Sequence, residues 1–162
     1  MAVECASGVD IEGPLDAVVV WDGPADTINL NAADVRVSGI TVRHEGDDFF
    51  YALHCDAPGP GRVILDRVAA YSDSKSALGI GICAGQSLEA RGCLFVRGER
   101  GRTSEPVLAH DMPDGSPGAR VLLQDCYVYS HTGGPEAVWT SLAHGVPEPS
   151  PTLPSRWEPI AC

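Results

Sequence analysis

The sequence predicts an all-β fold: a short, single-stranded, right-handed parallel β-helix of about four to five coils with a Pro-rich C-terminal extension. Three observations support this prediction. One pattern of apolar residues recurs along the chain, its repeats superpose into columns, and clusters of Gly, Pro and Asp separate short β-rich runs that lack helical periodicity. The 162 residues suit one domain of this kind.

Four segments carry the repeat. They are VRVSGITV (35–42), VILDRVAA (63–70), LEARGCLF (88–95) and VLLQDCYV (121–128), and their first residues lie 28, 25 and 33 positions apart. Superposed, they give four apolar columns: Val35, Val63, Leu88 and Val121; Val37, Leu65, Ala90 and Leu123; Ile40, Val68, Cys93 and Cys126; and Val42, Ala70, Phe95 and Val128. Stacked repeats can bury a core that no single repeat could bury alone.

A two-residue break interrupts each segment. Because side chains alternate along a strand, positions three and six of a continuous strand cannot face the same side. We therefore expect a sharp corner, with a short strand on either side, at Gly39, Arg67, Gly92 and Asp125.

The remaining strands and the ends of the chain complete the predicted organisation. A third strand per coil is expected at 49–55, 77–83, 106–110 and 137–144, and an earlier coil at 9–13, 17–21 and 27–30. Residues 1–145 are assigned to the β-helix domain, with 1–8 as a candidate cap. Residues 146–162 contain five prolines, which favour an extended tail. This tail either folds back with Trp157 over the last coil, or reaches a neighbouring subunit with Trp157 and Ile160 as anchors.

Charge and cysteine content restrict the partners. The net charge is −11, from 22 acidic and 11 basic residues, and such a field repels nucleic acid and anionic membrane surfaces. No apolar run approaches the length of a membrane span, and no secretory signal is expected at the start. The six cysteines form no CxxC pair and are expected to be free thiols.

The four repeats, together with TINLNAADVRVSGITVRHEG (27–46), resemble the pectin-lyase-like right-handed β-helix superfamily. The resemblance covers about residues 9–145 and is closest to the non-catalytic β-helix proteins of phage appendages and virions. It implies the fold but no single activity, because the superfamily also includes polysaccharide lyases and hydrolases.

A polar groove is predicted on the outer surface, just after each repeat segment. Its candidate binding residues are Glu45, Asp73, Arg97, Glu99 and His131, beside His44, Ser72 and Ser130. Residues one coil apart lie near 5 Å, so paired carboxylates for acid–base chemistry are feasible there. A solvated edge held by ion pairs is the simpler interpretation. The sequence shows no cluster of three aspartates with an arginine partner, and no catalytic residue is assigned.

Two further groups of residues are candidates for metal or redox chemistry. His54, His110 and His144 occur at similar points of successive turns, where stacked imidazoles could bind a metal, although strand-end histidines are commoner. Cys93 and Cys126 share a column and are expected to be buried thiols, with a disulfide or metal as the alternative. Neither a metal nor a cofactor is predicted.

The function predicted from these features is that of a structural or adhesive component of a viral, phage-like particle, such as a capsid decoration or tail appendage, without catalysis. Its expected partners are other virion proteins, copies of itself in an oligomer such as a trimer, and a surface glycan. The expected location is the virion, assembled in the host cytoplasm. The alternatives are a carbohydrate-active lyase or hydrolase that uses the groove carboxylates, and a glycan-binding β-helix module outside a virus.

Overall fold

The computed structural model describes residues 3–14, 16–55, 61–82, 85–98, 100, 105–111, 120–131 and 138–141. Within these residues the chain forms strands and no helix. The strands are β1 (Val3–Glu4), β2 (Asp10–Glu12), β3 (Val18–Trp21), β4 (Ile28–Asn29), β5 (Val35–Ser38), β6 (Thr41–His44), β7 (Leu53–Cys55), β8 (Gly61–Asp66), β9 (Ala69–Ser72), β10 (Leu78–Ile82), β11 (Gln86–Arg91), β12 (Leu94–Arg97), β13 (Val107–Asp111), β14 (Arg120–Gln124), β15 (Tyr127–Ser130) and β16 (Val138–Ser141).

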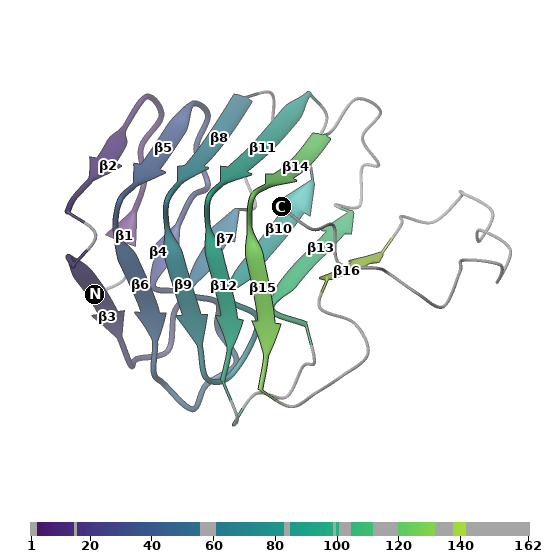
Figure 1. Ribbon diagram of the computed structural model, residues 1–162. Helices are drawn as coiled ribbons and strands as arrows, with labels where there is room; N and C mark the ends of the chain where they lie inside the picture. The colour runs from purple at the N-terminus through teal and green to yellow at the C-terminus, as the bar shows by residue number, and fades with distance from the viewer. Residues whose placement is uncertain are drawn as a thin grey trace, which may run out of the picture.

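The strands form three parallel sheets that the chain visits in a fixed order (Figure 1). The first sheet is β1-β4-β7-β10-β13-β16, the second β2-β5-β8-β11-β14 and the third β3-β6-β9-β12-β15. In Figure 1 the third sheet runs downwards on the near side and the first runs upwards behind it, while the chain advances from left to right. This is a right-handed parallel β-helix, as predicted.

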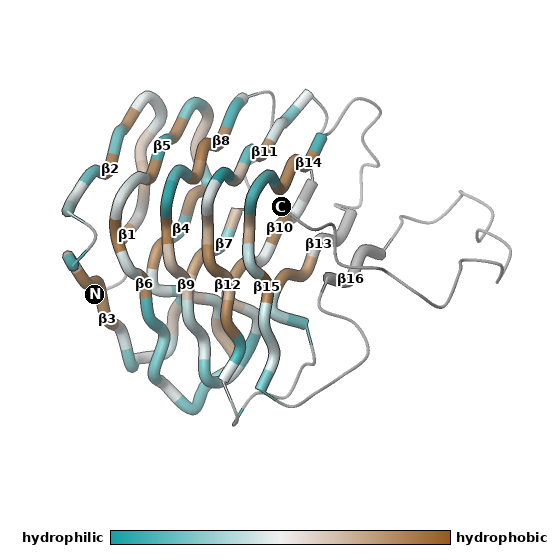
Figure 2. Tube along the Cα trace, in the orientation of Figure 1, coloured by the Kyte–Doolittle hydropathy of each residue, from teal (hydrophilic) through white to brown (hydrophobic). Residues whose placement is uncertain are grey.

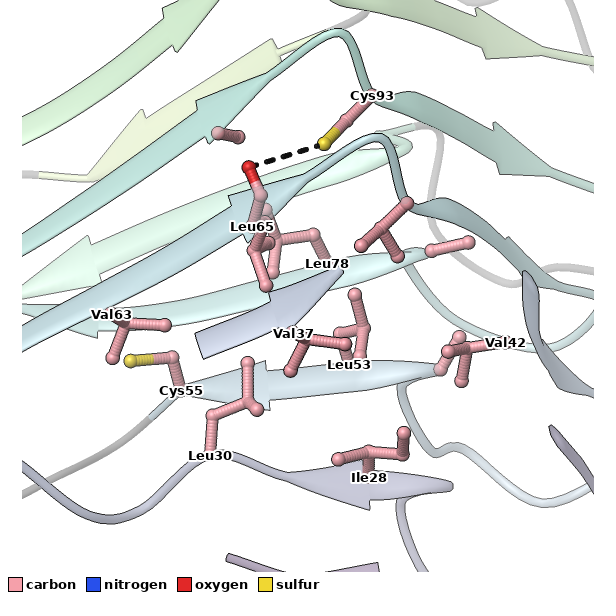
Figure 3. Packing of buried hydrophobic residues seen from close by; sticks show 14 of the residues in the cluster. Ile28, Leu30, Val37, Val42, Leu53, Cys55, Val63, Leu65, Leu78 and Cys93 are labelled. Atoms are coloured by element: carbon pink, nitrogen blue, oxygen red, sulfur yellow. Dashed lines mark hydrogen bonds between the residues drawn. The ribbon is translucent and has the colours of Figure 1, made fainter. Parts of the chain in front are cut away.

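The structure contains the predicted apolar columns. Val37 is paired with Leu65, Leu65 with Ala90, and Ala90 with Leu123 in the register of the second sheet. Figure 2 shows hydrophobic residues recurring at similar places on neighbouring strands, and Figure 3 shows that their side chains point into one interior. The core is fully buried in the middle coils. Leu123 and Val128 are only partly buried, because no described strand follows β14 and β15 in their sheets.

The corners lie at the four predicted positions. Gly39, Arg67, Gly92 and Asp125 all have positive φ, between 53° and 69°. This left-handed conformation turns the chain between the second and third sheets, and it costs least at glycine. The corners also stack, since the amide of Gly39 donates to Asp66 O at 3.0 Å and that of Arg67 to Arg91 O at 2.8 Å.

The ends of the chain differ in part from the prediction. Val3 and Glu4, expected within a cap, instead form β1 and pair in parallel with β4. The tail at 146–162, with Trp157 and Ile160, lies outside the described residues, as do Cys83, Glu99, His144 and Cys162. In the described part of the chain, no helix is long and apolar enough to cross a membrane.

Candidate functional site

A polar column ends the third sheet on its inner side. His44, Ser72, Arg97 and Ser130 are aligned on successive strands. His44, Ser72 and Arg97 are no more than 2 % exposed, and the NH1 group of Arg97 donates to Ser130 Oγ at 3.3 Å. Burial lowers the pKa of Arg97, against the opposing charge of Glu105. This column belongs to the inner wall of the helix.

The placement of Arg97 corrects the expectation that it lines the outer groove. Side chains alternate along β12, so Phe95 and Arg97 point inwards while Leu94 and Val96 point outwards. The guanidinium therefore lies beneath the surface on which it was expected to act.

The residues that follow this column form a ladder of their own on the outside. The backbone amide of Asp73 donates to His44 O at 3.1 Å, that of Gly98 to Ser72 O at 2.8 Å, and that of His131 to Arg97 O at 3.1 Å. Parallel pairing thus extends one residue beyond the strands and stacks Glu45, Asp73, Gly98 and His131 on successive coils. Three of the five predicted binding residues, Glu45, Asp73 and His131, are brought together in this way.

An open pocket of about 180 Å³ lies along this ladder. Its lining residues are Arg43, His44, Glu45, Tyr71, Asp73, Val96, Gly98 and His131. This volume is below the range of pockets for drug-sized ligands and suits a ligand fragment about as large as one sugar ring. A second cavity of about 10 Å³, lined by Cys55, Ile80 and Gln86 among others, has room for no more than a water molecule.

Arginines hold the two carboxylates of the pocket. Arg43 NH2 lies 3.1 Å from Glu45 Oε1, and the same guanidinium lies over the ring of Tyr71 at 5.9 Å from its centroid. Arg100 NH2 lies 2.9 Å from Asp73 Oδ2, and its NH1 lies 2.6 Å from Asp47 Oδ1. The hydrogen bond to Asp73 and the charge of Asp47 raise the pKa of Arg100. Such exposed pairs add little stability, but they fix where the carboxylate oxygens point.

Gly98 and Arg100 are site residues that the sequence analysis missed. A Cβ atom at position 98 would collide with Asp73 Oδ1, so the carboxylate of Asp73 needs a glycine there. The signal was available in the alignment, because Gly98 follows Arg97 just as Asp73 follows Ser72. Glu99, which was predicted at this place in the groove, lies outside the described residues.

The register separates two of the three histidines considered for a stacked metal site, and the third, His144, lies outside the described residues. His54 is aligned with Gly79, whereas His110 is aligned with Gly81, two residues further along β10. His54 Nδ1 instead lies 2.8 Å from Asp26 Oδ2. Burial would raise the pKa of Asp26, but the hydrogen bonds from His54 and from the Tyr51 amide outweigh it and lower that pKa. Among the described residues, no group of three or more potential ligands converges.

None of the four cysteines in the described chain forms a disulfide: Cys5, Cys55, Cys93 and Cys126. Cys93 is buried in the third column, and its thiol donates to Arg91 O at 3.3 Å. Cys126 is half-buried beside it. Its interaction with Cys93 lowers the pKa of Cys126 to about 7, against the effect of burial. Cys93 therefore acts as a small core residue.

The pocket combines two oriented carboxylates, an exposed imidazole and the ring of Tyr71. Carboxylates accept hydrogen bonds from hydroxyl groups, an imidazole can donate or accept, and an aromatic ring offers an apolar face. This arrangement suits recognition of a small polyhydroxylated group. Comparison of the sequence with models of protein families and with curated proteins, and of the structure with solved structures, finds no match.

Proposed function

We propose that the protein is a non-catalytic adhesive module that binds a surface glycan in the pocket along Glu45, Asp73, Gly98 and His131. The observation that carries this proposal is the pairing of each carboxylate with its own arginine at the rim of a pocket as large as one sugar ring. Oxygens fixed in this way are ready acceptors for the hydroxyl groups of a sugar.

The glycan that fits this surface is uncharged. The chain carries a net charge of −11, so a uronate, sialylated or sulfated chain would meet repulsion as it approached. The two cations beside the pocket, Arg43 and Arg100, already pair with Glu45, Asp47 and Asp73. A neutral sugar can use the carboxylates without displacing these pairs.

The same pairs argue against hydrolysis. A glycosidase needs one carboxyl group that gives up a proton to the leaving oxygen and a second that attacks or activates water. Here Glu45 is ion-paired with Arg43, and Asp73 accepts a hydrogen bond from Arg100, which is the role of a positioned acceptor and not of a proton donor. The groove therefore supports binding better than bond cleavage.

The particle setting of this function is proposed from the resemblance of the four repeats to phage appendage and virion proteins. We propose that copies of the chain assemble as an adhesive or decorating component of such a particle. Size-exclusion chromatography with light scattering tests the assembly: an oligomer such as a trimer is expected, and a strict monomer that ignores other particle proteins would contradict it.

A glycan array tests the binding. The wild-type protein should bind neutral glycans, and Asp73→Asn and Glu45→Gln should each weaken the affinity for the best of them at least tenfold. Asp66→Asn is the matched control, because Asp66 also pairs with an arginine but lies at the end of β8, in the second sheet. Binding to no glycan would overturn the proposal, and release of cleaved product would support the lyase or hydrolase alternative instead.

A further inference from the structure

The outer face of β15 carries two aromatic side chains that the core does not use. Tyr127 is 62 % exposed and Tyr129 is 42 % exposed. They alternate with the inward-facing Val128 and Ser130, so both rings lie on the outside of the third sheet. Among the described strands, β15 is the last of that sheet (Figure 1). Large apolar groups at an exposed sheet edge are a hazard that folds usually avoid, and their presence marks a contact surface.

The two rings are stacked, with nearly parallel planes. Their centroids lie 6.3 Å apart, with an angle of 14° between the ring planes. The neighbouring strand supplies an apolar base, because Leu94 is aligned with Tyr127 and Val96 with Tyr129. Neither tyrosine is needed to fill the interior, which Val128 and Phe95 occupy.

This surface continues into the pocket. The ring of Tyr129 lies 5.1 Å from that of His131 in an edge-to-face arrangement, and His131 lines the pocket. Val96, beside Tyr129, lines the pocket as well. Tyr127, Tyr129 and His131 thus form one row that leads from the open face of β15 to the carboxylates.

We infer that Tyr127 and Tyr129 form a platform for the further units of a neutral, β-linked hexopyranose chain whose first unit occupies the pocket. This inference rests on the proposed function and adds the class and length of the ligand. A β-linked hexopyranose with equatorial substituents has flat faces of C–H groups, which pack on aromatic rings, while its hydroxyl groups point sideways to water or to polar side chains.

The occupant is a glycan because of where the row ends. The ring of Tyr127 lies 6.3 Å from that of Tyr129, which lies 5.1 Å from that of His131, so a chain whose first unit occupies the pocket can extend along this row. The row finishes at acidic and imidazole groups, which hydrogen-bond hydroxyls. A second copy of the chain on the same face would place the Glu45 and Asp73 carboxylates against an acidic surface, because the net charge is −11.

The test is isothermal titration calorimetry with three series of neutral β-1,4-linked oligosaccharides, built from glucose, mannose and N-acetylglucosamine, each from one to six units long. For the wild-type protein, the affinity in at least one series should rise at least tenfold between one unit and four. The double variant Tyr127→Ala/Tyr129→Ala should lose that rise and keep the affinity for the single unit. Tyr127→Phe/Tyr129→Phe should keep the rise, because it retains the rings.

Val18→Ala/Val20→Ala is the matched control, since these side chains are similarly exposed on β3, at the opposite edge of the same sheet. This control should bind as the wild type does. Long-chain affinity that survives the tyrosine double variant, or binding to none of the three series, would overturn the inference. The proposed function fails separately: in that case no glycan of any class binds, or Asp73→Asn leaves glycan binding unchanged.

Discussion

The carboxylate of Asp73 occupies the space that a side chain at position 98 would fill, because Gly98 lies directly beside it on the next turn. A methyl group at position 98 would have to displace Asp73 Oδ1 and with it the 2.9 Å contact between Asp73 and Arg100. The position of one pocket carboxylate therefore depends on a missing side chain one coil away.

Gly98→Ala should weaken glycan binding at least tenfold while the protein remains folded. The reason is that the carboxylate of Asp73 would move, while the alanine lies outside the core. Calorimetric titration measures the affinity and circular dichroism confirms the fold. Gly92→Ala, which changes a glycine of the previous corner where a Cβ meets only Arg67 Cγ at 3.6 Å, should bind like the wild type. Full binding by Gly98→Ala would show that Asp73 does not contact the ligand.

The two corner glycines should respond differently to the same substitution. Both Gly39 and Gly92 have positive φ, which costs a non-glycine residue about 1 kcal/mol. At Gly39 a Cβ would also collide with the carbonyl oxygen of Gly13. Gly39→Ala should therefore lower the free energy of unfolding by about 2–4 kcal/mol, and Gly92→Ala by only about 1 kcal/mol. Urea denaturation of both variants measures this; equal losses would contradict the corner geometry.

The buried His44 should make stability depend on pH. Burial lowers the pKa of His44 from its ordinary value of 6.5, although Asp26 and other nearby acids oppose the shift. The folded state thus favours the neutral ring. The stability this provides is fully present above pH 6.5 and is lost as the pH falls below it towards the lowered pKa, by at most about 1.4 kcal/mol per pH unit.

Urea denaturation of the wild type between pH 5 and pH 8 should show this loss, while His44→Gln should show a flatter profile. Val20→Ala is the control, since it is an exposed substitution that removes no titratable group and should keep the slope of the wild type. The account of His44 is wrong if its replacement leaves the slope between pH 5 and 6.5 as it was.

The position of a leucine along its column should determine how much its replacement by alanine lowers the free energy of unfolding. Leu65 is fully buried in the middle of the second column, whereas Leu123 is partly exposed at its end. Leu65→Ala should lower the free energy of unfolding by about 2–5 kcal/mol, which is the range for substitutions that leave a cavity. Leu123→Ala should lower it clearly less. A larger loss at Leu123 than at Leu65, measured by urea denaturation, would contradict the order of the stack.

Much of the fold could be predicted because the same apolar pattern recurs at equivalent positions of successive coils. The break in the apolar pattern located the corners even at Arg67 and Asp125, where no glycine marks them. Arg97 was predicted on the outer surface because it is charged. It lies two residues after the buried Phe95 on the same strand, and therefore on the same inward face. The polar inner column is an exception to the apolar rule that guided the prediction.

The site could be predicted only where it follows from stacking. Glu45, Asp73 and His131 come together because the ladder continues beyond the strands. The contribution of Arg100 depends on its side-chain conformation, which reaches Asp47 and Asp73 across two coils. No spacing in the sequence encodes that reach. The row formed by Tyr127, Tyr129 and His131 could have been predicted from the alternation of side chains along β15. It was missed because the apolar columns include only the inward-facing residues of that strand.

Backbone amide NMR during titration with the tightest-binding neutral oligosaccharide tests the central claim most directly. The account predicts that the largest shifts fall on Glu45, Asp73, Gly98 and His131, followed by Tyr127 and Tyr129. The outer face of the second sheet, with Arg62 and Glu89, should not respond. Shifts centred on Arg62 and Glu89, with none along the ladder from Glu45 to His131, would contradict it.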